Sequence, residues 1–338
     1  MILPPAHMLA PAFLHALHIP GLELESSKML VAGLSLRRLD WVEWFVLENG
    51  DTAERLKADF EEGSHTFLVV NRPDFQGDDA AADVLADSDM TTLQHLVTAL
   101  RVAKPGELLD PLGSMRYERI RSRNRRTPGH FGRQLFERQS VLPYALQKGD
   151  VTEIEAILGD LCHPDVANDR TIQLALRHFD SSYDHYLDVE ERLLHAFTAL
   201  EATFGEYKKS ARPVAGVSLG RSASALWRNS VGNTFASFLD DKNQARGLRN
   251  AAAHGDFNDW TDTEINAMIE RLREVLRVGL RHLLRLAARR ANLTSELESV
   301  APGLGTVPGK VAFQHVLGHA ANASVGAVTL LEQLFLES

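Results

Sequence analysis

The sequence predicts an α+β protein, in which a mixed α/β domain at residues 1–149 precedes an all-helical domain at residues 150–338. Strand-length apolar runs bounded by turn residues occur before residue 150, whereas apolar residues at helical spacing dominate after it. The chain has 338 residues, 44% of them hydrophobic, which is enough to bury two cores.

Composition excludes several classes of protein. A net charge of -9 and a pI near 5.9 argue against binding nucleic acid by bulk charge, so any RNA contact needs local basic patches. The single cysteine, Cys162, excludes internal disulfides and all-cysteine metal sites. The first twenty residues lack a basic start, and no run of 18 apolar residues occurs. We therefore expect a soluble cytoplasmic protein with no membrane association.

The first half is expected to alternate strands and helices. Residues 28–36 and 67–70 are strand-length apolar runs, and residues 51–63 have helical spacing closed by a glycine. The acidic, alanine-rich residues 74–89 are expected to form a solvated loop with a frayed helical turn. Residues 93–102 fit either a strand or a helix.

A basic segment follows at residues 115–138. Within it Arg119, Arg121 and Arg123 alternate with other residues, which on one strand would place their guanidinium groups on one face. Such a face is suited to RNA phosphates. The alternative is a solvated edge strand, or a loop paired with the acidic excess of the chain.

The second half is predicted to be a series of helices, at residues 151–161, 170–178, 183–204, 221–239 and 241–253. The third carries an apolar stripe with spacings of four, three and four, made by Leu193, Phe197, Leu200 and Phe204. Gly205 follows this stripe as a helix stop.

A long helix is expected from Thr261, which forms a capping box with Glu264, to about residue 291. Arg273, Arg277 and Arg281 begin a series of arginines that recur every four residues along it. This stripe is a candidate grip on the RNA backbone; alternatively, it is a solvated face whose arginine stems cover apolar surface.

The last predicted helix covers residues 309–335. Its His315 and His319 have metal-pair spacing, but no third ligand is evident, and neither Cys162 nor His163 has a matching second pair. No metal and no cofactor are expected.

The chemistry of the chain centres on residues 247–256, which contain Arg249, Asn250, three alanines and His254. On a helix, Asn250 and His254 lie four residues apart on one face, and Arg249 is long enough to reach them. The alanines keep this face slim, so that a second copy of the helix can approach across a two-fold axis. An imidazole beside an arginine is suited to proton transfer next to a phosphate.

The segment from Arg249 to His254 resembles the Arg-polar-x-x-x-His signature of the HEPN superfamily of helical ribonucleases. Residues 191–205, with their Ala-Leu-Glu run ending at Glu201, are similar to the preceding core helix of the Apea-like HEPN branch. The resemblance covers residues 150–290. It implies metal-independent RNA cleavage to a 2′,3′-cyclic phosphate at a site shared by two protomers. In that site His254 would be the acid or base, Arg249 would bind the phosphate, Asn250 would orient groups, and Glu201 would position Arg249 or His254.

The resulting hypothesis is a homodimeric HEPN endoribonuclease that acts on tRNA or mRNA, as a toxin or anti-phage defence effector. Its first half, or an antitoxin or defence-system partner protein, would restrain it. The alternative is a non-catalytic HEPN-like module for RNA binding, protein interaction or dimerisation.

Overall fold

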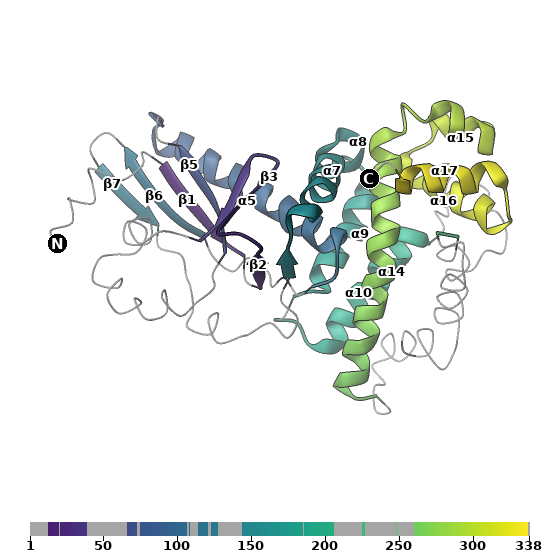
Figure 1. Cartoon of the computed structure of the whole chain (residues 1–338), viewed down its shortest axis with the longest axis horizontal. Helices are drawn as coiled ribbons and strands as arrows, with labels where there is room; N and C mark the ends of the chain where they lie inside the picture. The colour runs from purple at the N-terminus through teal and green to yellow at the C-terminus, as the bar shows by residue number, and fades with distance from the viewer. Residues whose placement is uncertain are drawn as a thin grey trace. The chain divides into compact units, whose positions relative to one another are not determined.

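The computed structural model describes residues 13–19, 21–38, 66–72, 75–106, 108, 114–120, 123–127, 144–184, 186–205, 225–226, 248 and 260–336. These residues form α-helices and an antiparallel sheet, so the chain is an α+β protein (Figure 1). Two compact units are present: Met1–Val97 with Gly106–Glu155, and Thr98–Pro105 with Ala156–Ser338. The cuts between these units fall after residues 97, 105 and 155, and the domain boundary expected after residue 149 stays a prediction. Within the described ranges, no helix is long and apolar enough to cross a membrane.

The first unit contains a six-stranded antiparallel sheet in the order β3-β4-β5-β1-β6-β7. Its strands are β1 (Phe13–His18), β3 (Lys28–Val31), β4 (Leu34–Arg37), β5 (Phe67–Arg72), β6 (Ser114–Ile120) and β7 (Arg123–Thr127). A separate parallel pair joins β2 (Leu22–Leu24) to β8 (Tyr144–Leu146), just before the short helix η1 (Lys148–Asp150). All six residues of β1 are buried, so both faces of the sheet centre are covered.

The strand expected at residues 28–36 is a tight hairpin. Ala32 and Gly33 form its two-residue turn, with φ of 49° and 77°. Positive φ at both central positions matches the twist of the paired strands, and glycine accepts this conformation without steric cost. The Ala32 amide donates to Glu155 Oε1 at 2.6 Å, which helps to hold the less favourable alanine in place.

The acidic segment at residues 74–89 is largely helical, so the prediction of a loop there is wrong. Helix α5 (Asp79–Ala103) begins after Asp78, whose carboxylate accepts from the Ala81 amide at 2.9 Å. The alanines of this segment favour helix. Ala82 packs against Phe13 of β1, so α5 lies along one face of the sheet (Figure 1). The same helix includes residues 93–102, which resolves their ambiguity.

One polar cluster joins α5 to the sheet. The Asp89 carboxylate receives hydrogen bonds from Arg72 of β5 at 2.6 and 2.9 Å and lies 3.1 Å from His15 Nδ1 of β1. Asp89 and His15 are buried, whereas Arg72 is partly exposed. The acidic helix therefore supplies the carboxylate that a buried histidine and a neighbouring arginine need.

Helices make up the described part of the second unit, which also includes the end of α5 at residues 98–103. They are α7 (Val151–Cys162), which begins in the first unit, α8 (Pro164–Ala167), α9 (Arg170–Ser181), α10 (Val189–Phe204), α14 (Asp262–Arg289), α15 (Thr294–Val300), α16 (Gly309–Ala321) and α17 (Val325–Leu336), with the short η2 (Leu304–Thr306). The long helix α14 packs against α8, α9, α10, α16 and α17 and is the axis of this unit (Figure 1).

Local signals predicted much of this unit. Thr261 and Glu264 form the expected capping box of α14, and the four stripe residues of α10 are buried. Both predictions are confirmed.

Two expected helices have different bounds. Helix α10 starts at Val189 rather than at residue 183, because Asp188 and Glu191 form a capping box there. The helix expected at residues 309–335 is split into α16 and α17. The helices expected at residues 51–63, 221–239 and 241–253 lie outside the described residues, apart from residues 225–226 and 248.

Two glycines allow close helix contacts. A Cβ at Gly279 of α14 would overlap the ring of Phe204 of α10, and one at Gly309 of α16 would lie 2.6 Å from Ala287 Cβ of α14. Only glycine permits these approaches at full packing density.

Candidate functional site

The expected catalytic residues Arg249, Asn250 and His254 lie outside the described residues. Leu248, the residue before them, is helical and fully buried. Glu201 lies in the last turn of α10 with an exposed side chain. Of the expected site, the structure therefore describes the exposed Glu201 and, next to the motif, the buried Leu248.

The basic segment expected as one strand is a hairpin, and that expectation is wrong. Strand β6 ends at Ile120 and β7 begins at Arg123, opposite Ile120, while Arg119 is opposite Asn124. Residues directly opposite each other share a face, so positions 119 and 123 fall on opposite faces. Arg121 lies outside the described residues. Because the chain reverses here, positions 119 and 123 do not share the face of one continuous strand, while the RNA-binding role of Arg119, Arg121 and Arg123 stays a prediction.

Two arginines of the expected RNA stripe on α14 are buried. The side chains of Arg273 and Arg277 are only 3% and 5% exposed, and Arg281 is partly buried, with its Nε 3.4 Å from the Arg277 carbonyl oxygen. The prediction of an exposed stripe through Arg273 and Arg277 is therefore wrong, because both guanidinium groups make hydrogen bonds inside the helical unit.

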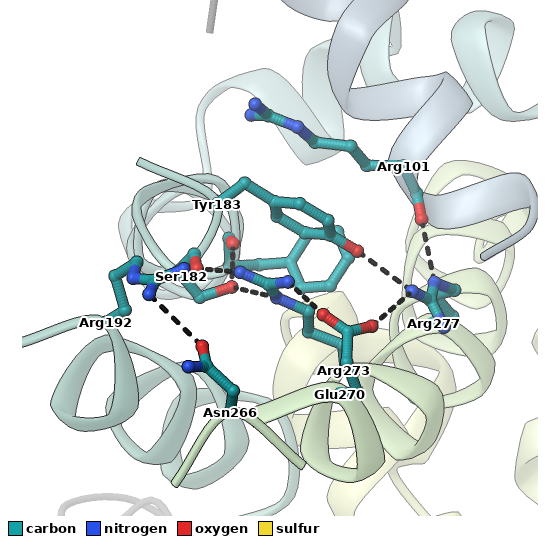
Figure 2. Close-up of polar contacts among 9 residues, drawn as sticks. Arg101, Ser182, Tyr183, Arg192, Asn266, Glu270, Arg273 and Arg277 are labelled. Carbon is teal, nitrogen blue, oxygen red and sulfur yellow. Dashed lines mark hydrogen bonds and ion pairs between the residues drawn. The ribbon is translucent and has the colours of Figure 1, made fainter. Parts of the chain in front are cut away.

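Arg273 lies against Tyr183, in the turn between α9 and α10 (Figure 2). Its Cζ is 3.8 Å from the centre of the Tyr183 ring. It donates to the hydroxyl of Ser182 at 3.2 Å, to the Ser182 carbonyl and to the carboxylate of Glu270. Burial lowers the pKa of Arg273, while Tyr183 and Glu270 act in the opposite direction.

Arg277 lies one turn further along α14 and joins three elements (Figure 2). Its Nε donates to the carbonyl of Arg101 in α5 at 3.2 Å, and its Nη2 donates to the Tyr183 hydroxyl at 3.1 Å. Glu270 lies 3.8 Å from Arg277 and bridges it to Arg273. The Arg101 guanidinium lies against the Tyr183 ring, with Cζ 4.7 Å from its centre, and pairs with Asp180 of α9. We call Arg101, Tyr183, Glu270, Arg273 and Arg277 the arginine–tyrosine cluster.

Four buried basic side chains of this unit share a pattern: each donates to a carbonyl at the end of a helix. Arg277 reaches the last turn of α5, Arg273 reaches Ser182 at the end of α9, and Arg285 reaches Leu334 in the last turn of α17. Lys310 of α16 reaches Thr203 in the last turn of α10. The last carbonyls of a helix have no partner within it, and they carry the negative end of the helix dipole. The arginine repeat of α14 is therefore largely a set of internal helix caps.

Two buried basic groups, Lys310 and His282, have strongly lowered pKa values. Burial lowers the pKa of Lys310 to about 7, although Asp169 opposes the shift. Burial also lowers the pKa of His282 to about 4; its Nδ1 lies 2.8 Å from the Val278 carbonyl oxygen. Both groups have a large neutral fraction at neutral pH, as buried bases do.

Sequence reasoning missed Tyr183, Ser182 and Lys310. A lone lysine in the apolar stretch 309–313 was the one local signal of a buried cation. Within the described residues, no group of three or more His, Cys, Asp or Glu side chains is arranged to hold a metal ion. Comparison with protein-family models, curated protein sequences and solved structures finds no match for this chain.

Proposed function

We propose that this protein is a metal-independent endoribonuclease of the HEPN type, cytoplasmic and homodimeric. Leu248 is the observation that supports this most directly. It is helical and fully buried, and it immediately precedes Arg249 in a stretch of chain between two packed helices, α10 and α14. A motif helix beside a helical core is the setting that the HEPN resemblance implies, with the helical half as the HEPN-like bundle.

In the proposed reaction His254 removes the proton from a ribose 2′-hydroxyl, or donates one to the leaving 5′-oxygen. The 2′-oxygen attacks phosphorus, the bond from phosphorus to the 5′-oxygen breaks, and a 2′,3′-cyclic phosphate remains. Arg249 binds the phosphate and stabilises its developing charge, while Asn250 orients substrate or histidine. Glu201, exposed on α10, is assigned at most a positioning role. The substrate would be tRNA or mRNA, and the biological role that of a toxin or anti-phage effector, restrained by the first half or by a partner protein.

The second candidate is a non-catalytic HEPN-like module for RNA binding or dimerisation. One observation favours it: Arg273 and Arg277 are occupied by helix ends rather than exposed. The surface that would grip RNA along α14 is therefore smaller than the sequence predicts.

The two candidates differ in the fate of RNA. Wild-type protein, His254→Ala, Arg249→Ala and the control His319→Ala are each incubated with total RNA and EDTA, and fragment ends are tested for cyclic phosphate. We expect cleavage by the wild type and the control, and a loss of about 100-fold or more in the other two. Cleavage that persists unchanged in His254→Ala contradicts the site, and binding without cleavage by the wild type supports the module.

A further inference from the structure

Two histidines from neighbouring helices meet in the second unit. His178 of α9 and His195 of α10 are 17 residues apart in sequence, yet their Nδ1 atoms are 2.7 Å apart. The ring centres are 4.9 Å apart and the ring planes are inclined by 32°. The rings therefore converge at their Nδ1 edges.

The packing of α9 against α10 positions this pair. Phe179, next to His178, and Ala196, next to His195, are fully buried, whereas both histidines are partly exposed. Their backbones are thus held by the core while water still reaches the rings. Among the residues that the structure describes, each imidazole has only the other as a hydrogen-bond partner. No carboxylate is bound to either ring there.

The pair presents neutral nitrogen ligands. Burial lowers the pKa of His178, and the neighbouring His195 and Arg177 lower it further, so the neutral ring is favoured at neutral pH. In the present hydrogen bond one Nδ1 carries a proton and the other a lone pair. When both protons reside on Nε2, both lone pairs face the space between the rings.

A metal ion fits this spacing after a small adjustment. Bonds of about 2.0–2.1 Å from zinc to imidazole nitrogen, at angles between square and tetrahedral, need ligand atoms about 2.9–3.4 Å apart. The observed 2.7 Å requires the rings to separate by a few tenths of an ångström or more. Imidazole suits Zn²⁺ and Cu²⁺, whereas Mg²⁺ and Ca²⁺ prefer oxygen.

We propose that His178 and His195 form a two-histidine binding site for a divalent transition-metal ion, Zn²⁺ or Cu²⁺. Because no third protein ligand is present among the described residues, water fills the remaining coordination positions. The site is separate from the residues assigned to RNA cleavage, and cleavage in EDTA does not depend on it.

Copper provides the direct probe. The full chain, freed of metal by dialysis against EDTA, is titrated with Cu²⁺ at pH 7.5 by calorimetry, and the bound ion is examined by electron paramagnetic resonance. We expect a site with two nitrogen ligands, and affinity that falls about tenfold or more in His178→Ala and in His195→Ala. Zn²⁺ should compete for the same site.

The matched control is His319→Ala, which removes one member of the partly buried His315–His319 pair on α16. It should leave the site intact. His178→Gln and His195→Gln keep more of the side-chain volume and replace the alanine variants if these do not fold. Wild-type affinity in both His178 and His195 variants, or loss of binding in His319→Ala alone, overturns the proposal, as does the absence of a two-nitrogen copper site in the wild type.

Discussion

Lys310 is a buried lysine whose amine caps the end of a neighbouring helix. Its amine donates to the Thr203 carbonyl, one of the last carbonyls of α10, and its side chain is almost fully buried. Burial lowers its pKa from 10.5 to about 7. In either protonation state the amine can donate this hydrogen bond, but only the charged form carries the cost of desolvation.

We expect Lys310→Met to change the pH dependence of stability. Between pH 7 and about 10.5, unfolded chains hold a proton on Lys310 that folded chains have lost, so the free energy of unfolding rises with pH in this window. The slope attributable to Lys310 is at most about 1.4 kcal/mol per pH unit. Urea unfolding from pH 7 to 9 should show this rise in the wild type and a flatter dependence in Lys310→Met.

The exposed Lys148 supplies the control, because Lys148→Met removes a lysine without a burial cost. Its pH dependence should follow the wild type. Equal slopes for Lys310→Met and the wild type would mean that Lys310 is charged throughout, against the shift described.

Asp89 also has a lowered pKa, but here it is the charged form that the fold stabilises, and the effect falls at acidic pH. Burial raises the pKa of Asp89, but Arg72 and His15 together outweigh burial and leave it below the ordinary 3.8. A carboxyl with a lowered pKa stabilises the fold above about pH 4, and this contribution is lost as the pH falls through the folded value. Asp89→Asn should therefore cost about 2 kcal/mol at pH 7, and its difference from the wild type should shrink below pH 4. Thermal unfolding between pH 3 and 7 measures both effects.

Asp87→Asn is the matched control for this variant, since Asp87 is an exposed carboxylate on the same helix. It should change stability by less than about 0.5 kcal/mol. If Asp87→Asn lowered stability by a similar amount, the effect would come from the overall charge of α5 rather than from the buried contact of Asp89 with Arg72 and His15.

At the scale of elements, α14 stabilises the second unit through helix ends as well as through its apolar side chains. Arg277 makes two hydrogen bonds in different directions, one from Nε to Arg101 and one from Nη2 to Tyr183. Lysine keeps the charge but has a single compact ammonium, which cannot reproduce this fork. We expect Arg277→Lys to lower the free energy of unfolding by about 1–3 kcal/mol, measured by urea denaturation.

Arg170→Lys, at an exposed position at the start of α9, serves as the control and should be nearly neutral. Unchanged stability of Arg277→Lys together with weakened RNA binding would restore Arg277 to an RNA-binding role. Reduced stability with unchanged RNA affinity supports its function as a helix cap.

Elements were predictable where their signals are local. The capping box at Thr261 and the stripe from Leu193 to Phe204 each lie within a few residues, and both are confirmed. Helix α5 was missed because its acidic start resembled a solvated loop, whereas the partners that bury Asp89 are on two strands. The hairpin of β6 and β7 was missed because alternation along a chain does not reveal where the chain reverses.

At the scale of the whole molecule, contacts between distant parts of the chain explain why the arginine stripe on α14 was not correctly predicted. The residues that occupy Arg273 and Arg277 include Ser182 and Tyr183, more than 90 residues earlier in the chain. Periodicity shows that these arginines share a helix face, but not whether that face is covered. The motif from Arg249 to His254, by contrast, is recognised from its sequence spacing alone. Its proposed activity nevertheless depends on a second protomer, which the sequence of one chain does not show.

A mixture of inactive variants tests this dependence on a second protomer. If Arg249 from one protomer and His254 from the other form one site, a mixed dimer of Arg249→Ala and His254→Ala contains one intact site of two. Random mixing makes half of the dimers mixed, so co-refolded protein should recover about a quarter of wild-type RNA cleavage, although each variant alone is inactive. Cleavage is measured as cyclic-phosphate ends released per protomer. No recovery, with co-purification through a tag on only one of the variants showing that mixed dimers form, would place Arg249 and His254 of each site within one chain and exclude the shared site.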